Sequence, residues 1–179
     1  MLPVKIHLKE NYFLDYLLFY FKYKPGKAQR RSETHLTNQV VIKGTHDIGK
    51  LILANISASN TKKESFGTSH HTIYIPDQHY DIKSKFLFFN EAQTDLINKQ
   101  IKFNFNIDFR MFCVSAAEKG IRYDVAIRSF IRLLNLHFSD DFYERLKKSD
   151  YRKRKEWDEY MKQALKIIQS EAYIDDNQI

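Results

Sequence analysis

Apolar and polar residues alternate along the N-terminal part of the chain with two different periods. Val4, Ile6 and Leu8 occupy every second position, which is typical of a β-strand. Two more short apolar runs, at residues 39–43 and 70–76, are also predicted to be strands. Residues 82–89 fit either a strand or a loop.

Two segments of the same part repeat apolar residues at helical spacing. They are residues 11–22 and 46–57, and Thr45 is the expected N-cap of the second helix. A break at a Pro–Gly pair predicts an exposed loop over residues 22–31. Residues 57–69 are polar and contain glycine, so we expect a second exposed loop there.

From Asn90 onward the hydrophobic pattern is helical. Apolar residues recur every four positions, at Ile97, Ile101, Phe105 and Phe109. We therefore predict one long helix that runs to Lys119 and is ended by Gly120. Residues 102–109 also alternate and would fit a strand, but the longer repeat favours the helix.

Two shorter helices are expected after the long one. The first covers residues 125–135 with Asp124 as its cap, and the second begins at Ser139. A further apolar stripe follows at Trp157, Met161, Ala164 and Ile168. The expected shared core of this helical part contains Phe109, Phe130, Leu134, Phe142 and Trp157.

These patterns predict an α+β fold. Residues 1–89 would form an N-terminal part of mixed strands and helices, residues 90–170 an all-helical part with a helix-turn-helix-like unit, and residues 171–179 a flexible tail. A chain of 179 residues with 43% apolar side chains can bury a core of its own. No apolar run reaches the length of roughly 20 residues that a membrane span needs.

Cysteine content and charge narrow the function classes. Cys113 is the single cysteine, which excludes an intramolecular disulfide and fits a cytoplasmic protein. A zinc site built on CxxC pairs is also excluded, because no such pair exists. Cys113 lies in an apolar stretch and is expected in the core. The net charge of +7 favours nucleic acid or another anionic partner.

The positive charge is concentrated in two segments. Seven basic residues and one acid lie between Arg145 and Lys155, and five basic residues without an acid lie in residues 22–31. Glu144 lies four residues from Lys148 and Glu156 lies four residues from Arg152, and these two pairs use few of the seven basic residues. An anionic ligand is therefore favoured over a merely solvated charged helix.

Residues 121–155 have the outline of a helix-turn-helix. Two helices meet at a tight connection, with Ala126 where they would cross and Asn135 where such a turn usually has glycine. The internal apolar contacts would be Phe130, Leu134, Phe142 and Leu146. In this arrangement the N-terminal half of the second helix meets base edges in the major groove. A plain helical hairpin is the alternative.

The stretch GIRYDVAIRSFIRLLNLHFSDDFYERLKKSDYRKRK resembles the C-terminal helical module of small DNA-binding proteins from bacterial phages and mobile elements. In those proteins a helix-turn-helix ends in a basic helix that contains tyrosine. The resemblance covers about the last third of the chain. It implies a regulatory or DNA-processing role.

The histidines offer a competing interpretation. His35 with Thr37 and His70 with Thr72 form two His-x-Thr triplets, which resemble the signature of two-histidine phosphoesterases. We expect them not to be catalytic, because the separation of 35 residues is short for that fold and the triplet is common by chance. A metal site is not expected either, since adjacent histidines on a strand point to opposite faces. Its candidate ligands would be His70, His71, His79, Asp77 and Asp81.

The sequence thus favours a non-enzymatic protein that binds DNA, expected to be double-stranded, without a cofactor or metal. A small phosphodiesterase and an adaptor or inhibitor that binds an acidic protein are the alternatives, and homo-oligomerisation stays open. Residues expected to contact nucleic acid are Tyr143, Arg145, Lys147, Lys148, Tyr151, Arg152, Lys153, Arg154, Lys155, Lys27, Arg30 and Arg31.

Overall fold

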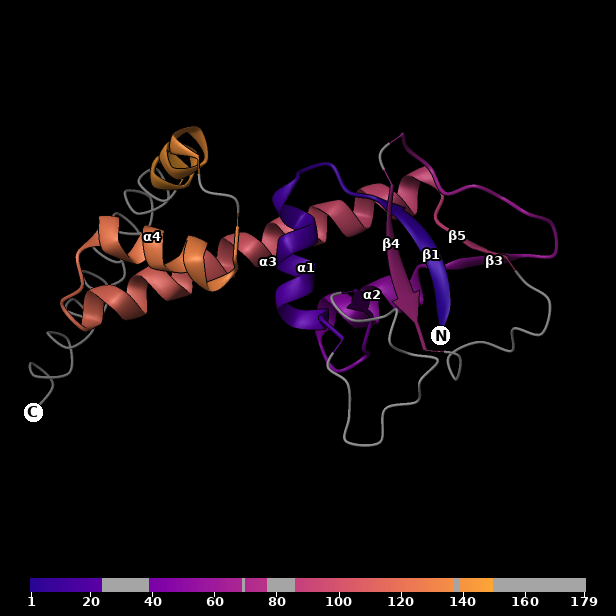
Figure 1. The fold of residues 1–179 in the computed structure, drawn as a ribbon, viewed down its shortest axis with the longest axis horizontal. Helices are drawn as coiled ribbons and strands as arrows, with labels where there is room; N and C mark the ends of the chain where they lie inside the picture. Colours follow the sequence, from indigo (N-terminus) through magenta and orange to yellow (C-terminus); the bar gives the residue numbers. More distant parts are fainter. Residues whose placement is uncertain (24–38, 69, 77–85, 137–138, 150–179) are drawn as a thin grey trace, which may run out of the picture.

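The computed structural model describes residues 1–23, 39–68, 70–76, 86–136 and 139–149. These residues form the predicted α+β fold, in which strands and two short helices are followed by a mostly helical part. One long helix, α3 (Glu91–Glu118), runs past both. Figure 1 shows the strands beside its N-terminal half and the later helices at its other end.

The strands form two small sheets. In the first, β4 (His70–Ile75) lies between β1 (Leu2–His7), to which it is antiparallel, and β2 (Val40–Val41), to which it is parallel. The second pairs β3 (Ser57–Ser59) with β5 (Phe86–Phe88) in antiparallel register. The predicted strands near Val4 and at 70–76 are confirmed, because their alternate side chains are buried.

Two helices complete the N-terminal part, α1 (Tyr12–Phe21) and α2 (Asp47–Ala54). The cap of α2 is His46, whose Nδ1 accepts a hydrogen bond from the Ile48 amide at 3.3 Å. The prediction that Thr45 caps this helix is therefore wrong by one residue. The predicted loop over 57–69 is also wrong at its start, because Ser57–Ser59 pair with β5.

The long helix α3 has the boundaries that the sequence predicts. Asn90 and Gln93 form a reciprocal capping box, with both side-chain-to-backbone hydrogen bonds at 2.9 Å. Gly120 follows the helix with φ of +71° and donates its amide hydrogen to the Ala117 carbonyl. The alternative strand at 102–109 is wrong, since Phe105 and Phe109 face the core one helical turn apart.

Two helices follow α3. The first is α4 (Tyr123–Leu133), whose N-cap Arg122 makes no side-chain cap bond. Asp124 lies inside α4 and pairs with Arg122 at 3.2 Å, so it is not the predicted cap. Residues 140–149 are helical, and the Ser139 hydroxyl accepts a hydrogen bond from the Phe142 amide at 3.2 Å, as expected for its first turn.

One apolar core extends through both parts. It contains Phe109, Cys113, Phe130 and Leu134, and Phe142 packs against it, so these expectations are confirmed. Trp157, expected in the same core, lies outside the described residues. No helix within the described ranges combines the length and the hydropathy that a membrane span requires.

Candidate nucleic-acid interface

The connection between α4 and helix 140–149 begins with a left-handed residue. Asn135 has φ of +54°, its amide donates to the Arg132 carbonyl at 3.0 Å, and the Leu136 amide donates to the Ile131 carbonyl at 2.9 Å. This pair of bonds ends a helix in a Schellman motif, and asparagine tolerates the left-handed region better than most side chains. Asn135 therefore takes the conformation that glycine often has at such a turn.

The inner side of the helical pair is apolar, as the sequence predicts. Ala126, Phe130, Leu134 and Leu146 are buried. The Phe142 ring lies 5.1 Å from the Tyr12 ring of α1, measured between centroids. Helix 140–149 is thus attached to the body through its apolar face, and its other side is available to a ligand.

Cations from both helices surround one tyrosine ring. The Arg128 guanidinium of α4 lies 4.9 Å from the centroid of the Tyr143 ring, and Lys147 Nζ lies 6.0 Å from the same centroid. Both cations are on exposed residues, whereas Tyr143 is half-buried. We call Arg128, Tyr143 and Lys147 the cationic ridge. Stacking on an aromatic ring limits where such long side chains can move, and so holds their charges close together.

The other predicted contacts in the described part of this helix differ in their surroundings. Lys148 is exposed and has no ion pair with another described residue. Arg145 instead donates a hydrogen bond to Glu10 at 3.3 Å, beside a cavity of about 190 Å³ between the start of α1 and this helix. Lys147 also pairs with Glu144 at 3.5 Å. Both pairs are largely exposed and hence weak.

The charge of helix 140–149 changes sign along its length. Asp140 and Asp141 occupy the first turn, where negative charge is favoured by the helix dipole, and Lys147 and Lys148 occupy the end. Phosphates are repelled by the acidic turn and attracted by the basic end. The geometry therefore favours phosphate contacts by the later half of the helix over base contacts by its first turn.

Several predicted contact residues lie outside the described residues. They are Tyr151, Arg152, Lys153, Arg154, Lys155, Lys27, Arg30 and Arg31. Sequence reasoning also missed Arg128 as a site residue. A signal for it was present, because Arg128 and Arg132 are four residues apart and therefore share one side of α4, where both are exposed, whereas Ile127 and Ile131 are buried.

The histidines do not assemble into a catalytic pair among the described residues. His70 Nε2 lies 3.0 Å from the Ser65 carbonyl oxygen, and its ring meets that of His7 edge-on at 6.5 Å. His35 and Thr37 fall outside the described residues. Within the described ranges no three histidine, cysteine, aspartate or glutamate side chains are arranged to hold a metal ion.

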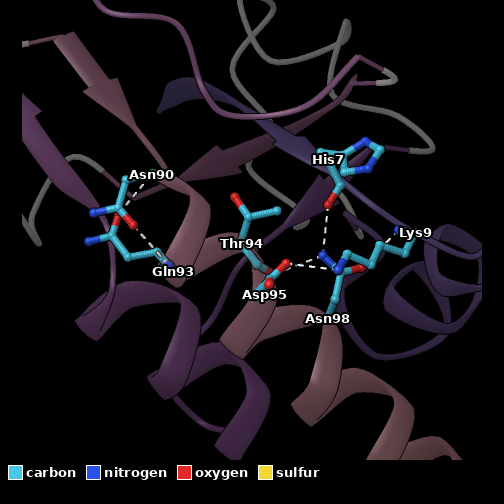
Figure 2. Close-up of polar contacts among 7 residues, drawn as sticks. All are labelled: His7, Lys9, Asn90, Gln93, Thr94, Asp95 and Asn98. Atoms are coloured by element: carbon cyan, nitrogen blue, oxygen red, sulfur yellow. Dashed lines mark hydrogen bonds and ion pairs between the residues drawn. The ribbon is translucent and has the colours of Figure 1, made fainter.

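A partly buried polar cluster at the start of α3 joins this helix to the end of β1 (Figure 2). The Asn98 side chain, 3% exposed, accepts from the Lys9 amide at 2.8 Å and donates to the His7 carbonyl at 2.9 Å. Lys9 also pairs with Asp95 at 2.8 Å, and its hydrogen bond holds the pKa of that carboxyl below its usual range. These bonds fix the strand end to the helix.

A second polar cluster joins α1 to the middle of α3. The hydroxyl groups of Tyr16 and Tyr20 both donate to the Asp108 carboxylate at 2.5 Å. Burial, followed by the bond to Asp108, raises the pKa of both tyrosines, that of Tyr20 to about 12. Neutral phenols that donate to a carboxylate hold two helices together and offer no nucleophile near neutral pH.

No protein-family model matches this chain, and neither the curated proteins nor the solved structures contain a significant match. Its function must therefore be inferred from its own residues and their arrangement.

Proposed function

We propose that the protein is a cytoplasmic, non-enzymatic DNA-binding protein that holds duplex DNA by its phosphates. The contacts come from the cationic ridge and from Lys148, with the rest of the basic run following directly in the sequence. Each lysine or arginine that neutralises a phosphate releases condensed counterions, which gives affinity independent of base sequence.

The observation that carries this proposal is the cationic ridge. Two cations from different helices lie around Tyr143 at 4.9 and 6.0 Å, on the side where the helical pair is exposed. Cations held by an aromatic ring lose less conformational freedom when they meet a phosphate than free side chains do. Tyrosine can in addition donate a hydrogen bond to a phosphate oxygen.

Charge along the chain supports an anionic ligand in the same place. Five acids, Asp124, Asp140, Asp141, Glu144 and Asp150, are the only ones between Arg122 and Lys155. In helix 140–149, Asp140 and Asp141 lie in the first turn, away from Lys147 and Lys148, and Glu144 pairs with Lys147 at 3.5 Å. The basic end then continues in sequence into Arg152, Lys153, Arg154 and Lys155. Repulsion within such a run is relieved when phosphates lie beside it.

The test is a salt titration of duplex binding by the variant Arg128→Ala, Lys147→Ala, Lys148→Ala. We expect weaker binding to every duplex alike, and a slope of log affinity against log salt reduced by up to about 3, roughly one unit per lost phosphate contact. Circular dichroism should show an unchanged fold, because all three positions are exposed.

A matched control removes three positive charges from the N-terminal part, with Lys5→Ala, Lys43→Ala and Lys62→Ala, which are also exposed. Its affinity should fall much less than that of the ridge variant. Equal losses in the two triple variants would show that only net charge matters. Unchanged affinity and slope in the ridge variant would reject the proposed interface.

A further inference from the structure

The side of α3 that faces away from the core is apolar as well. Five of its side chains are exposed: Leu96 at 44%, Phe103 at 59%, Ile107 at 43%, Met111 at 63% and Val114 at 47%. We call these five residues the outer stripe. Apolar side chains that are contiguous on a surface, unlike scattered ones, mark an interaction site.

The outer stripe lies opposite the buried face of the same helix. At about 100° per residue, the five positions fall within an arc of about 80°. The centre of that arc is about 160° from the centre of the buried face. The buried face is formed by Ile97, Ile101, Phe105, Phe109 and Cys113. The core uses only one side of α3, and the outer stripe belongs to no part of it.

The outer stripe also lacks charge. Two polar residues lie on the same side, Gln100 and Asn104, and the Gln100 amide donates to the Asn104 side-chain oxygen at 2.7 Å. Between Leu96 and Val114 no position within the arc of the outer stripe is charged, and Glu118 is the charged residue that follows on the same side, one turn after Val114. A helix side that is meant for water normally carries charges, so this one is suited to packing.

The spacing of the stripe suits a second helix with the same spacing. Leu96, Phe103, Ile107 and Val114 are separated by seven, four and seven residues, which places them in the two apolar positions of a heptad. The other two such positions between Leu96 and Val114 are Gln100 and Arg110. Side chains at those positions interdigitate with the same positions of a facing helix. A second copy of α3 supplies this pattern over a length of about 27 Å, from Leu96 to Val114.

The area of the outer stripe is adequate for a dimer. Five roughly half-exposed side chains on each copy, at about 100 Å² apiece, can bury about 1,000 Å² in all. A specific interface needs at least about that much, and the residues beside the stripe add to it. We propose that two copies of the chain associate through the outer stripes of their α3 helices in a two-fold symmetric homodimer.

The dimer is independent of the proposed DNA interface, because the cationic ridge lies on α4 and helix 140–149. Its test uses the full chain without DNA. Sedimentation velocity over a range of micromolar concentrations should give twice the monomer mass. The variant Ile107→Asp places two charges in the interface and should raise the dimer dissociation constant by about 100-fold or more.

The matched control is Ser115→Asp, which adds the same charge at an exposed position of α3 outside the outer stripe. This variant should dimerise like the unmodified chain, and so should the ridge variant. The variant Phe103→Asp provides a second test in case Ile107→Asp loses helical structure.

Two results would overturn the proposal. An unmodified chain that remains monomeric throughout would show that something else covers the outer stripe, such as another protein or residues 150–179 of the chain itself. A dimer equally stable in Ile107→Asp, Phe103→Asp and Ser115→Asp would show that the copies meet on another surface.

Discussion

The two ends of α3 are packed in different ways. Its N-terminal half lies against α2 and the end of β1, which come from far earlier in the chain, and Asn98 bonds to the backbone of residues 7 and 9. Its C-terminal half packs against α4, which follows it directly, and the connection there is a turn at Gly120. The first region therefore relies on contacts between distant residues, and the second on local turns and a shared apolar side.

Phe105 joins the two regions. Its ring lies 4.6 Å from that of Tyr12 and 5.4 Å from that of Tyr16 in α1, and 5.6 Å from that of Phe130 in α4, measured between centroids. The two regions thus share one core despite their different construction. They should unfold together unless this contact is removed.

The largest effect is expected for Phe105→Ala. A ring that is 1% exposed is replaced by a cavity, which should lower the free energy of unfolding by about 3–5 kcal/mol. The unfolding transitions measured by far-ultraviolet circular dichroism and by tyrosine signals, which we expect to coincide in the unmodified chain, should then occur at different denaturant concentrations. The control is Phe19→Ala, whose ring is 45% exposed and whose loss should cost far less. A coincident transition in Phe105→Ala would mean that other contacts couple the two regions.

The next effect concerns the distant contacts of the N-terminal region. In Asn98→Ala, the Lys9 amide and the His7 carbonyl both lose their partner, which should cost about 2–4 kcal/mol. In Asn98→Asp the Lys9 amide keeps its acceptor. A buried carboxylate oxygen then faces the His7 and Thr94 carbonyl oxygens, however, so a loss of stability at least as large is expected. Hydrogen exchange at Lys9 through local opening should accelerate in Asn98→Ala only. Equal exchange in both variants would contradict this role of Asn98.

The pH dependence of stability should report on the attachment of α1 to α3. Because the pKa of Tyr20 is raised from 10.0 to about 12 in the folded state, its contribution to stability is complete below pH 10 and is lost as the pH rises towards 12. The variant Tyr20→Phe should therefore lose less stability between these pH values than the unmodified chain. Denaturant midpoints across this range provide the measurement. Parallel pH profiles for Tyr20→Phe and the unmodified chain would show that Tyr20 does not contribute to the pH dependence of stability.

The smallest effect is expected at the local turn of the helical region. At φ of +54°, Asn135→Ala should destabilise by about 1 kcal/mol, because a Cβ without a polar group is disfavoured there, and Asn135→Gly should be neutral or slightly stabilising. Thermal unfolding can resolve this difference. If the two variants are equally stable, the left-handed residue does not limit the turn between α4 and helix 140–149.

Much of the fold follows from local periodicity. The alternation at Val4 and Ile6, the four-residue repeat of α3, and Ser139 at the start of the last described helix all correspond to observed elements. The N-caps at Thr45 and Asp124 were wrong, since several polar residues stand near each helix start and packing selects among them. The strand β3 was missed, because its partner Phe86–Phe88 lies far along the chain.

The candidate site, like the fold, could be predicted from the sequence only in part. The sequence by itself determined that a basic run with tyrosines follows an apolar helical pair, because charge and periodicity are local properties. Only the tertiary structure brought Arg128 of α4 to Tyr143 and turned Arg145 towards Glu10, since both depend on how helices pack. It also decided which of two apolar sides of α3 is buried. Both sides are hydrophobic, and the one that meets the strands, α1 and α4 became the core.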